Sequence, residues 1–276
     1  MNNIKAILDK METLPMSPSM LPKLLPYLSD VNTNFDEVVR IISLEQTLTA
    51  KLLQICNSAF FGQDEPVSSV AEAVNRVGYQ SIYLLAAMIN GSNSFPTPSP
   101  AGIDTGKLWK HSVSTAFNSK FAAESAGLDA NLLFTAGLMH DIGKVVVAQI
   151  AAGKNLPPFH LPSNQESLDR ETLTLGFNHA HVGAALLEKW NLPPQLVASV
   201  RHHHDPQGAA DFKKISACVA IGNALAHSQE YAKALESETF ATAMTILKLD
   251  SSHLKQWQLR FNEARDLIAG MSKLPL

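Results

Sequence analysis

The chain has 276 residues, of which 46% are hydrophobic, so it is long enough to bury a substantial core as one large domain or two small ones. Its formal net charge is −3 and its sequence pI is about 6.4, which excludes the strongly basic balance of many nucleic-acid and anionic-membrane binders. We therefore expect neither nucleic acid nor a membrane as a partner.

The cysteines and the apolar stretches predict a cytoplasmic protein. The only cysteines, Cys56 and Cys218, lie far apart among apolar residues, which is typical of buried free thiols rather than of a disulfide framework. Residues 1–12 lack the charged segment and the long apolar run of a signal peptide. The longest apolar stretch that we identify, at 82–89, is too short to cross a bilayer.

The first half of the chain carries helical periodicity. Apolar residues recur at helical spacing at 38–44 and at 70–77, where Gly78 closes the run, and no stretch alternates apolar with polar residues long enough to predict a strand. These patterns predict an all-α fold. Within LLQICNSAFF, which is too apolar to stay exposed, we expect three side chains to be buried: Leu52, Ile55 and Phe60.

One compositional break follows, at 91–106, where Gly, Ser and Pro are too dense for a long helix. We place a boundary there between an N-terminal helical bundle, residues 1–95, and a second helical bundle, residues 107–276, that packs against it. A surface loop inside one continuous domain is an equal alternative, because helical subdomains often share a core.

Beyond the break, the pattern predicts two helices that lead to a His-Asp doublet. Gly127 closes a helix that contains Phe117 and Phe121, and an apolar helix then starts near Leu132 and ends at His140.

The ten histidines are the main sign of chemistry, because neutral imidazole is a common metal ligand and a poor choice for a featureless core. The adjacent His140 and Asp141 can place a nitrogen and a carboxylate oxygen on one or two cations. Taken alone, such a doublet is weak evidence, since a solvated helix end also explains it. Its weight comes from the residues that accompany it along the chain: His111, His179, His203, His204 and Asn223.

The order of these residues resembles that of the HD superfamily of metal-dependent phosphohydrolases, and especially its HD-GYP branch. The shared order is a His, then HD-x-G-K, then a His with Gly four positions later, then a His-His pair, then a helix with a polar residue. The resemblance implies these metal ligands: His111, His140, Asp141, His179, His203 and His204. It also makes Lys144 a phosphate-facing lysine, and Asp141 and Lys144 the candidate catalytic residues.

Asn223 departs from the family pattern, because the HD proteins have Asp at that position. An Asn side chain offers a cation one neutral oxygen but no charge, which weakens binding and the tuning of a bound water. If Asn223 does complete the ligand set, we therefore expect an impaired site.

The first half of the chain narrows the resemblance to the HDOD family. Residues 57–62, NSAFFG, are similar to that family's NSA-x-FG, and residues 73–78, AVNRVG, are similar to its A-x-x-x-x-G helix. The motifs LWKHS, AGLMHDIGK and HVGAALLEKWNLP agree in the second half. The resemblance extends from Leu14 to His227 and so covers nearly the whole chain.

HDOD proteins resemble HD hydrolases that have generally lost metal ligands and serve as regulatory modules in bacterial signalling. The resemblance implies a signalling module with an unidentified partner protein and a pocket for a phosphorylated small molecule or nucleotide. The retained ligands leave two readings open: a divalent metal (Fe, Mn, Mg or Zn), or metal-free polar packing.

Two further functions are alternatives: a metal-dependent phosphohydrolase acting on a nucleotide or small phosphate ester, and a protein-interaction scaffold with an empty pocket. The segment DPQGAADFKK lacks the GYP motif, which disfavours cleavage of cyclic dinucleotides.

Two more histidines are secondary ligand candidates. His181 is two residues from His179 and so lies on another face of its helix. His202 takes the place of His203 in the ligand set if the preceding helix ends at a different residue. The rest are expected to be surface or packing residues: His160, His227 and His253.

Overall fold

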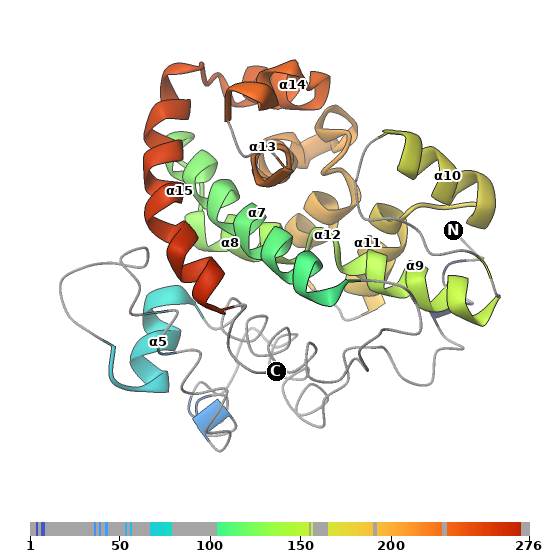
Figure 1. Ribbon diagram of the computed structural model, residues 1–276, viewed down its shortest axis with the longest axis horizontal. Coiled ribbons are helices and arrows are strands. Elements are labelled where there is room, and N and C mark those ends of the chain that lie inside the picture. The colour runs from blue at the N-terminus through green and yellow to red at the C-terminus, as the bar shows by residue number, and fades with distance from the viewer. Residues whose placement is uncertain are drawn as a thin grey trace.

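The computed structural model describes residues 67–78, 104–154, 156, 165–189, 192–227 and 231–271. It also describes nine residues near the N-terminus: Ile4, Ile7, Leu8, Asp36, Val39, Ile42, Ser43, Leu53 and Cys56. The regular structure of these parts is entirely helical, which confirms the predicted all-α fold (Figure 1).

The α-helices, labelled as in Figure 1, are α5 (Val70–Val77), α7 (Thr105–Ser125), α8 (Ala130–Met139), α9 (Ile142–Gly153), α10 (Gln165–Leu175), α11 (His179–Lys189), α12 (Pro194–Arg201), α13 (Lys213–His227), α14 (Glu238–Leu247) and α15 (Ser252–Met271). Short 3-10 turns occupy Pro206–Gly208, Ala210–Phe212 and Tyr231–Glu236.

Two predicted helix ends are confirmed. Gly78 follows α5 with a φ of 84°, and its N–H donates to the carbonyl of Val74 at 2.8 Å. Gly127 lies just beyond α7 with a φ of 66°, a conformation that glycine adopts without steric cost. Both helices therefore end where the sequence places a glycine.

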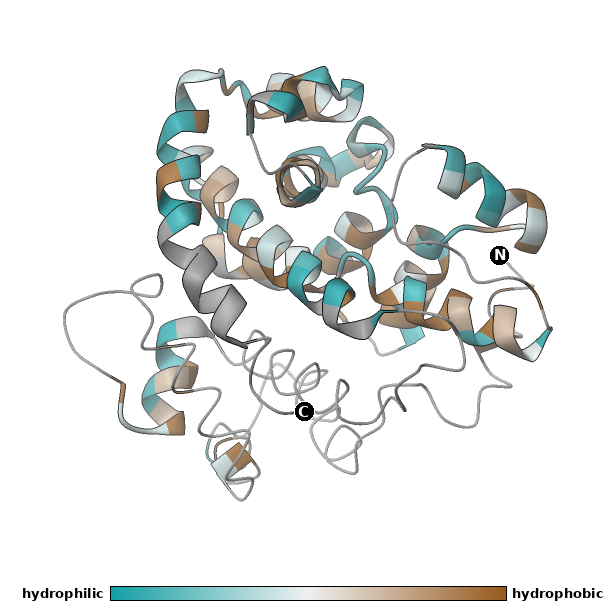
Figure 2. Cartoon of the chain, viewed as in Figure 1, coloured by the Kyte–Doolittle hydropathy of each residue, from teal (hydrophilic) through white to brown (hydrophobic). Residues whose placement is uncertain are grey.

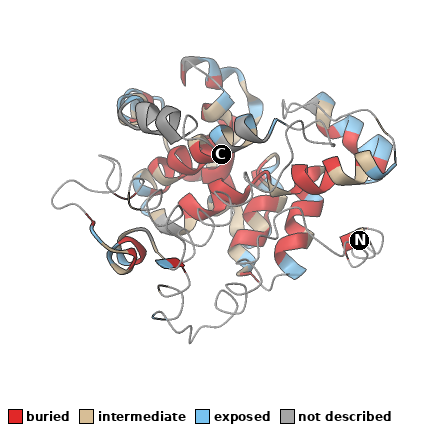
Figure 3. Ribbon diagram, turned by 60° about the horizontal axis from the view of Figure 1, so that its bottom comes forward, coloured by how far each residue is buried: buried red, intermediate tan, exposed pale blue. Residues whose placement is uncertain are grey.

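The core is centred on α7, which packs against α8, α13 and α15. Its aromatic side chains Phe117 and Phe121 are completely buried, as is Trp257 from α15. Figure 3 shows the buried residues concentrated on the central helices, with exposed residues on the outer ones. In Figure 2 the outer helix α10 is mostly hydrophilic, whereas α9 carries many hydrophobic residues. Burial of the apolar helical faces thus accounts for the stacking of these helices.

Residues from the first half of the chain share the core of the second half. Ile42, Cys56 and Val70 belong to the hydrophobic cluster that contains Phe117. A smaller cluster joins Ile4 and Leu8 to residues of α9 and α11. Most of 91–106 lies outside the described residues, so the division into 1–95 and 107–276 stays a prediction.

The three side chains predicted to be buried in the first half, Leu52, Ile55 and Phe60, lie outside the described residues. Their neighbour Cys56 is completely buried, and Leu53 packs against the same core. Cys56 and Cys218 are both free and buried, as predicted.

The segment Leu132–Gly153 has the length and apolar composition of a membrane span. From the sequence we considered only residues 82–89 as an apolar stretch and did not identify this one. Of its most apolar window, 83% is buried inside the protein. The segment is also divided between α8 and α9 by the doublet His140 and Asp141. Packing in the core accounts for its apolar composition.

Candidate metal centre

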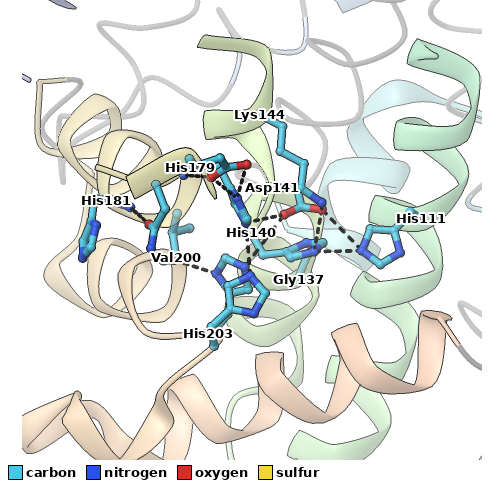
Figure 4. A network of polar contacts seen from close by, with 12 residues as sticks. His111, Gly137, His140, Asp141, Lys144, His179, His181, Val200 and His203 are labelled. Atoms are coloured by element: carbon cyan, nitrogen blue, oxygen red, sulfur yellow. Dashed lines mark hydrogen bonds and ion pairs between the residues drawn. The ribbon is translucent and has the colours of Figure 1, made fainter. Parts of the chain in front are cut away.

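The His-Asp doublet lies in the two-residue turn between α8 and α9, where it is completely buried. The structure brings it together with five of the other sequence-predicted residues: His111 from α7, Lys144 from α9, His179 at the start of α11, and His203 and His204 just after α12 (Figure 4). Their convergence was predicted from the order of the motifs.

Asp141 is the shared member of this centre. Its Oδ2 lies 2.6 Å from Lys144 Nζ, 3.2 Å from His140 Nε2 and 3.4 Å from His111 Nε2. Its Oδ1 faces the other way and lies 3.3 Å from His179 Nε2 and 3.8 Å from His203 Nε2. One carboxylate oxygen therefore serves each side of the centre.

The ligand-type atoms fall into two groups, each with its members within 4.8 Å of one another. The His111 group consists of His111, His140 and Asp141, and the His179 group consists of His179, His203 and His204. Because Asp141 Oδ1 also points toward the His179 group, the carboxylate bridges the two groups. Such an arrangement of ligand atoms can supply one or two divalent cations.

Backbone carbonyl groups fix the orientation of two of the imidazoles. His140 Nδ1 lies 2.8 Å from the carbonyl oxygen of Gly137, and His203 Nδ1 lies 2.7 Å from that of Val200. Since a carbonyl oxygen can only accept, each Nδ1 donates to its carbonyl, and each Nε2 is thereby turned toward the centre.

Glu171 orients a third imidazole and is the residue of the centre that our sequence reasoning missed. Its buried carboxylate lies 2.9 Å from His179 Nδ1, and it accepts the backbone N–H of His179 at 2.6 Å. The carboxylate therefore caps the first turn of α11 and also turns His179 Nε2 toward Asp141. The sequence gives little sign of this role, because Glu171 lies on a mainly polar helix beside other acidic residues such as Glu166 and Asp169.

We expect Glu171→Gln to weaken metal binding by about 10- to 100-fold, the usual cost of removing a carboxylate that supports a ligating His. The Gln side chain still accepts a hydrogen bond, so the loss isolates the effect of the charge. Glu166→Gln, on the exposed face of the same helix, is the matched control. Calorimetric titration with Mn²⁺ measures both variants, and equal affinities would show that Glu171 is only a helix cap.

Electrostatics keep most of the centre in a form that can bind a cation. Burial is the main cause that holds the pKa values of His111, His203 and His204 well below their usual range, so these imidazoles are neutral at pH 7. Burial alone would raise the pKa of Asp141, but His140 and Lys144 outweigh it and hold that pKa well below normal. The carboxyl group is therefore ionised.

His179 differs from the other imidazoles. Burial opposes its charged form, yet its interactions with Asp141 and Glu171 raise its pKa. The two carboxylates thus favour positive charge at the position of His179 Nε2, which is where the His179 group would hold a cation.

Two other residues considered in the sequence analysis, Asn223 and His227, lie on α13. Asn223 is buried on α13, and its Oδ1 is without a hydrogen-bond partner among the described residues. Its role as a ligand stays a prediction. His227, one turn further along α13, stacks on His111 with ring centroids 4.2 Å apart, so it packs against the centre.

The secondary candidates belong to neither ligand group. His181 is exposed and points away from the centre in Figure 4, as its helical position predicted. His202 is half-buried at the end of α12, His253 packs on Trp257, and His160 lies outside the described residues.

Comparison with known families and curated proteins gives a consistent match. The family model of the HDOD domain matches residues 14–206. An uncharacterized protein of Treponema pallidum is 26% identical over 79% of this chain and 43% of its own length. Ribonuclease Y of Thermus thermophilus is 30% identical over 50% of this chain but only 20% of its own length. The chain thus spans less than half the length of these relatives.

Solved structures share the fold at low sequence identity. A candidate phosphohydrolase from Shewanella amazonensis is 22% identical, with a TM-score of 0.66 and coverage of 97% of this chain and 96% of the other. An HDOD domain protein of unknown function from Geobacter sulfurreducens is 20% identical, with a TM-score of 0.61 and coverage of 98% and 96%. At these identities the likeness concerns the fold alone.

Proposed function

Because the chain belongs to the HDOD domain family, we propose that it is a signalling or regulatory module whose His-Asp centre binds a divalent metal. In this proposal the N-terminal half relays the state of the centre to a partner protein. The module is not an efficient enzyme.

The observation that carries the proposal is the convergence of buried acceptor atoms on one region. Asp141 Oδ1 and His203 Nε2 are both buried, both lack a hydrogen-bond partner among the described residues, and lie 3.8 Å apart. His179 Nε2 lies 3.1 Å from His204 Nε2. Leaving a buried polar atom unpaired costs about 1–3 kcal/mol. A divalent cation held by these atoms removes that cost.

The donor set fits a transition metal. Asp141 would share its carboxylate between the groups, with the imidazoles of the His111 group and the His179 group completing the ligands. An imidazole-rich set with one carboxylate favours Fe or Zn over Mg, which prefers oxygen ligands. A metal ion held by these residues would lower the pKa of a coordinated water and neutralise phosphate charge. His111 and His204 are only half-buried, whereas the other ligand residues are buried, so a phosphorylated ligand would reach the centre past one of these two side chains.

The packing of the helices offers a route for the relay. Helix α9 follows Asp141 directly and α11 begins at His179, so a displacement of the centre would act on both helices. The same two helices bury Ile4 and Leu8, and Lys189 at the end of α11 donates to the carbonyl oxygen of Leu8 at 2.8 Å. A shift between α9 and α11 on metal or ligand binding would therefore reach the N-terminal half.

The second candidate is a metal-dependent phosphohydrolase, which the match to Ribonuclease Y sequences over half of this chain favours. In that case Asp141 positions the metal, and Lys144, whose side chain is 7% exposed, holds its ammonium group at the carboxylate.

The two candidates differ in turnover, and we expect the wild-type protein to bind metal but to hydrolyse phosphate esters only marginally. The measurement combines metal analysis of protein purified without chelator with assays on ATP, bis(p-nitrophenyl) phosphate and a short RNA, each with Mn²⁺, Fe²⁺ or Mg²⁺. Robust turnover that Asp141→Ala abolishes would establish the hydrolase instead. A chain that retains no metal would be a scaffold.

A further inference from the structure

We propose that the two ligand groups bind metal unequally: the His179 group takes the first ion, and Lys144 keeps the His111 group weak. The inference rests on the proposed function, because it concerns the order in which the same centre fills. It follows from three differences between the two sides of Asp141.

The first difference is in the carboxylate itself. Asp141 Oδ2, which faces the His111 group, is paired with the Lys144 ammonium at 2.6 Å. Asp141 Oδ1, which faces the His179 group, is buried, and the imidazole nitrogen His179 Nε2 lies 3.3 Å from it. An ion bound by the His179 group meets imidazole ligands at this oxygen, whereas an ion bound by the His111 group must compete with an ammonium for the other one.

The second difference is in charge. The positive charge of Lys144 lies beside the His111 group, where it repels a divalent cation. The negative charge of Glu171 lies behind His179, where its carboxylate contacts Nδ1 at 2.9 Å. Both charges are buried, so water screens them little. The electrostatic gradient therefore draws the first cation to the His179 group.

The third difference is in preorganisation. In the His179 group, the Nδ1 atoms of His179 and His203 are anchored to Glu171 and to the carbonyl of Val200, and the exposed fractions of these side chains are 1% and 0%. The third member of that group, His204, is half-buried. In the His111 group, His140 alone is anchored, to the carbonyl of Gly137, whereas the His111 side chain is 14% exposed and stacks on the exposed His227. Fixed ligands lose less conformational entropy on binding a metal.

The test is a titration of the metal-free full chain with Mn²⁺, in which electron paramagnetic resonance distinguishes the free ion from the bound ion at each step. We expect one tight equivalent with the six-line signal of an isolated Mn²⁺, and a second equivalent that binds at least about tenfold more weakly. Lys144→Met, which removes the ammonium but keeps an unbranched side chain, is expected to strengthen the second equivalent by about tenfold or more and to produce a spin-coupled pair.

A matched pair of variants keeps the test decisive if Lys144→Met fails to fold. His204→Gln should abolish the tight equivalent, and His111→Gln should abolish only the weak one. Two equivalents of equal affinity in the wild type would overturn this proposal and leave metal binding intact. The same holds if His111→Gln loses the tight equivalent while His204→Gln keeps it. No bound Mn²⁺ at millimolar concentration in any variant would overturn the proposed function as well.

Discussion

Replacing Gly143 with Ala is expected to lower the free energy of unfolding by about 3 kcal/mol or more and to disrupt the His-Asp centre. A Cβ atom on Gly143 would lie 1.9 Å from the carbonyl oxygen of His179 and 2.7 Å from the backbone nitrogen of Gly183. Both contacts are with backbone, so no side-chain rotation relieves them. Helices α9 and α11 must separate, and Asp141 then moves away from His179.

The control for this prediction is Gly153→Ala at the other end of α9, where an added Cβ meets no atom within 4 Å. Since alanine favours helix, this change should stabilise the protein by up to about 1 kcal/mol. Urea unfolding followed by circular dichroism measures both variants. Equal unfolding midpoints would show that the backbone contact between α9 and α11 does not hold the centre together.

The second large effect is expected for Asp141→Asn, which should weaken Mn²⁺ binding by more than about 100-fold. Losing a residue that merely supports a ligand costs about 10- to 100-fold, and Asp141 is the carboxylate that both ligand groups share. Asn has nearly the same shape but carries no charge. The change also leaves the buried Lys144 without this ion-pair partner, so the far-ultraviolet circular dichroism of the variant must be compared with that of the wild type.

Asp169→Asn, at an exposed position on α10, serves as the control and should retain wild-type affinity. Calorimetric titration and metal analysis after dialysis give the affinity and the stoichiometry. A folded Asp141→Asn protein that binds Mn²⁺ as tightly as the wild type would place the metal elsewhere.

Much of the fold could be predicted from local sequence signals. The all-α class followed from helical periodicity, and the ends of α5 and α7 followed from Gly78 and Gly127, because the left-handed conformation that ends a helix favours glycine. The family match to residues 14–206 confirms the predicted HDOD resemblance. These features depend on residues close together in the chain, which is why the sequence reveals them.

The candidate site was only partly predictable. The sequence identified the converging histidines and Asp141 through their order, but it missed Glu171, eight residues before His179 on a separate helix. It also could not divide the ligands into two groups, because that division depends on which oxygen of Asp141 faces which helix. Long-range side-chain orientation is a property of the packed structure rather than of motif spacing.

Binding of a divalent metal at the His-Asp centre can be seen by anomalous X-ray scattering from a crystal of the full chain grown with Mn²⁺. We expect an anomalous peak within about 2.0–2.5 Å of Asp141 Oδ1 and the Nε2 atoms of the His179 group. A map with no peak at the centre, from a crystal in millimolar Mn²⁺, would show that these residues do not form a metal site.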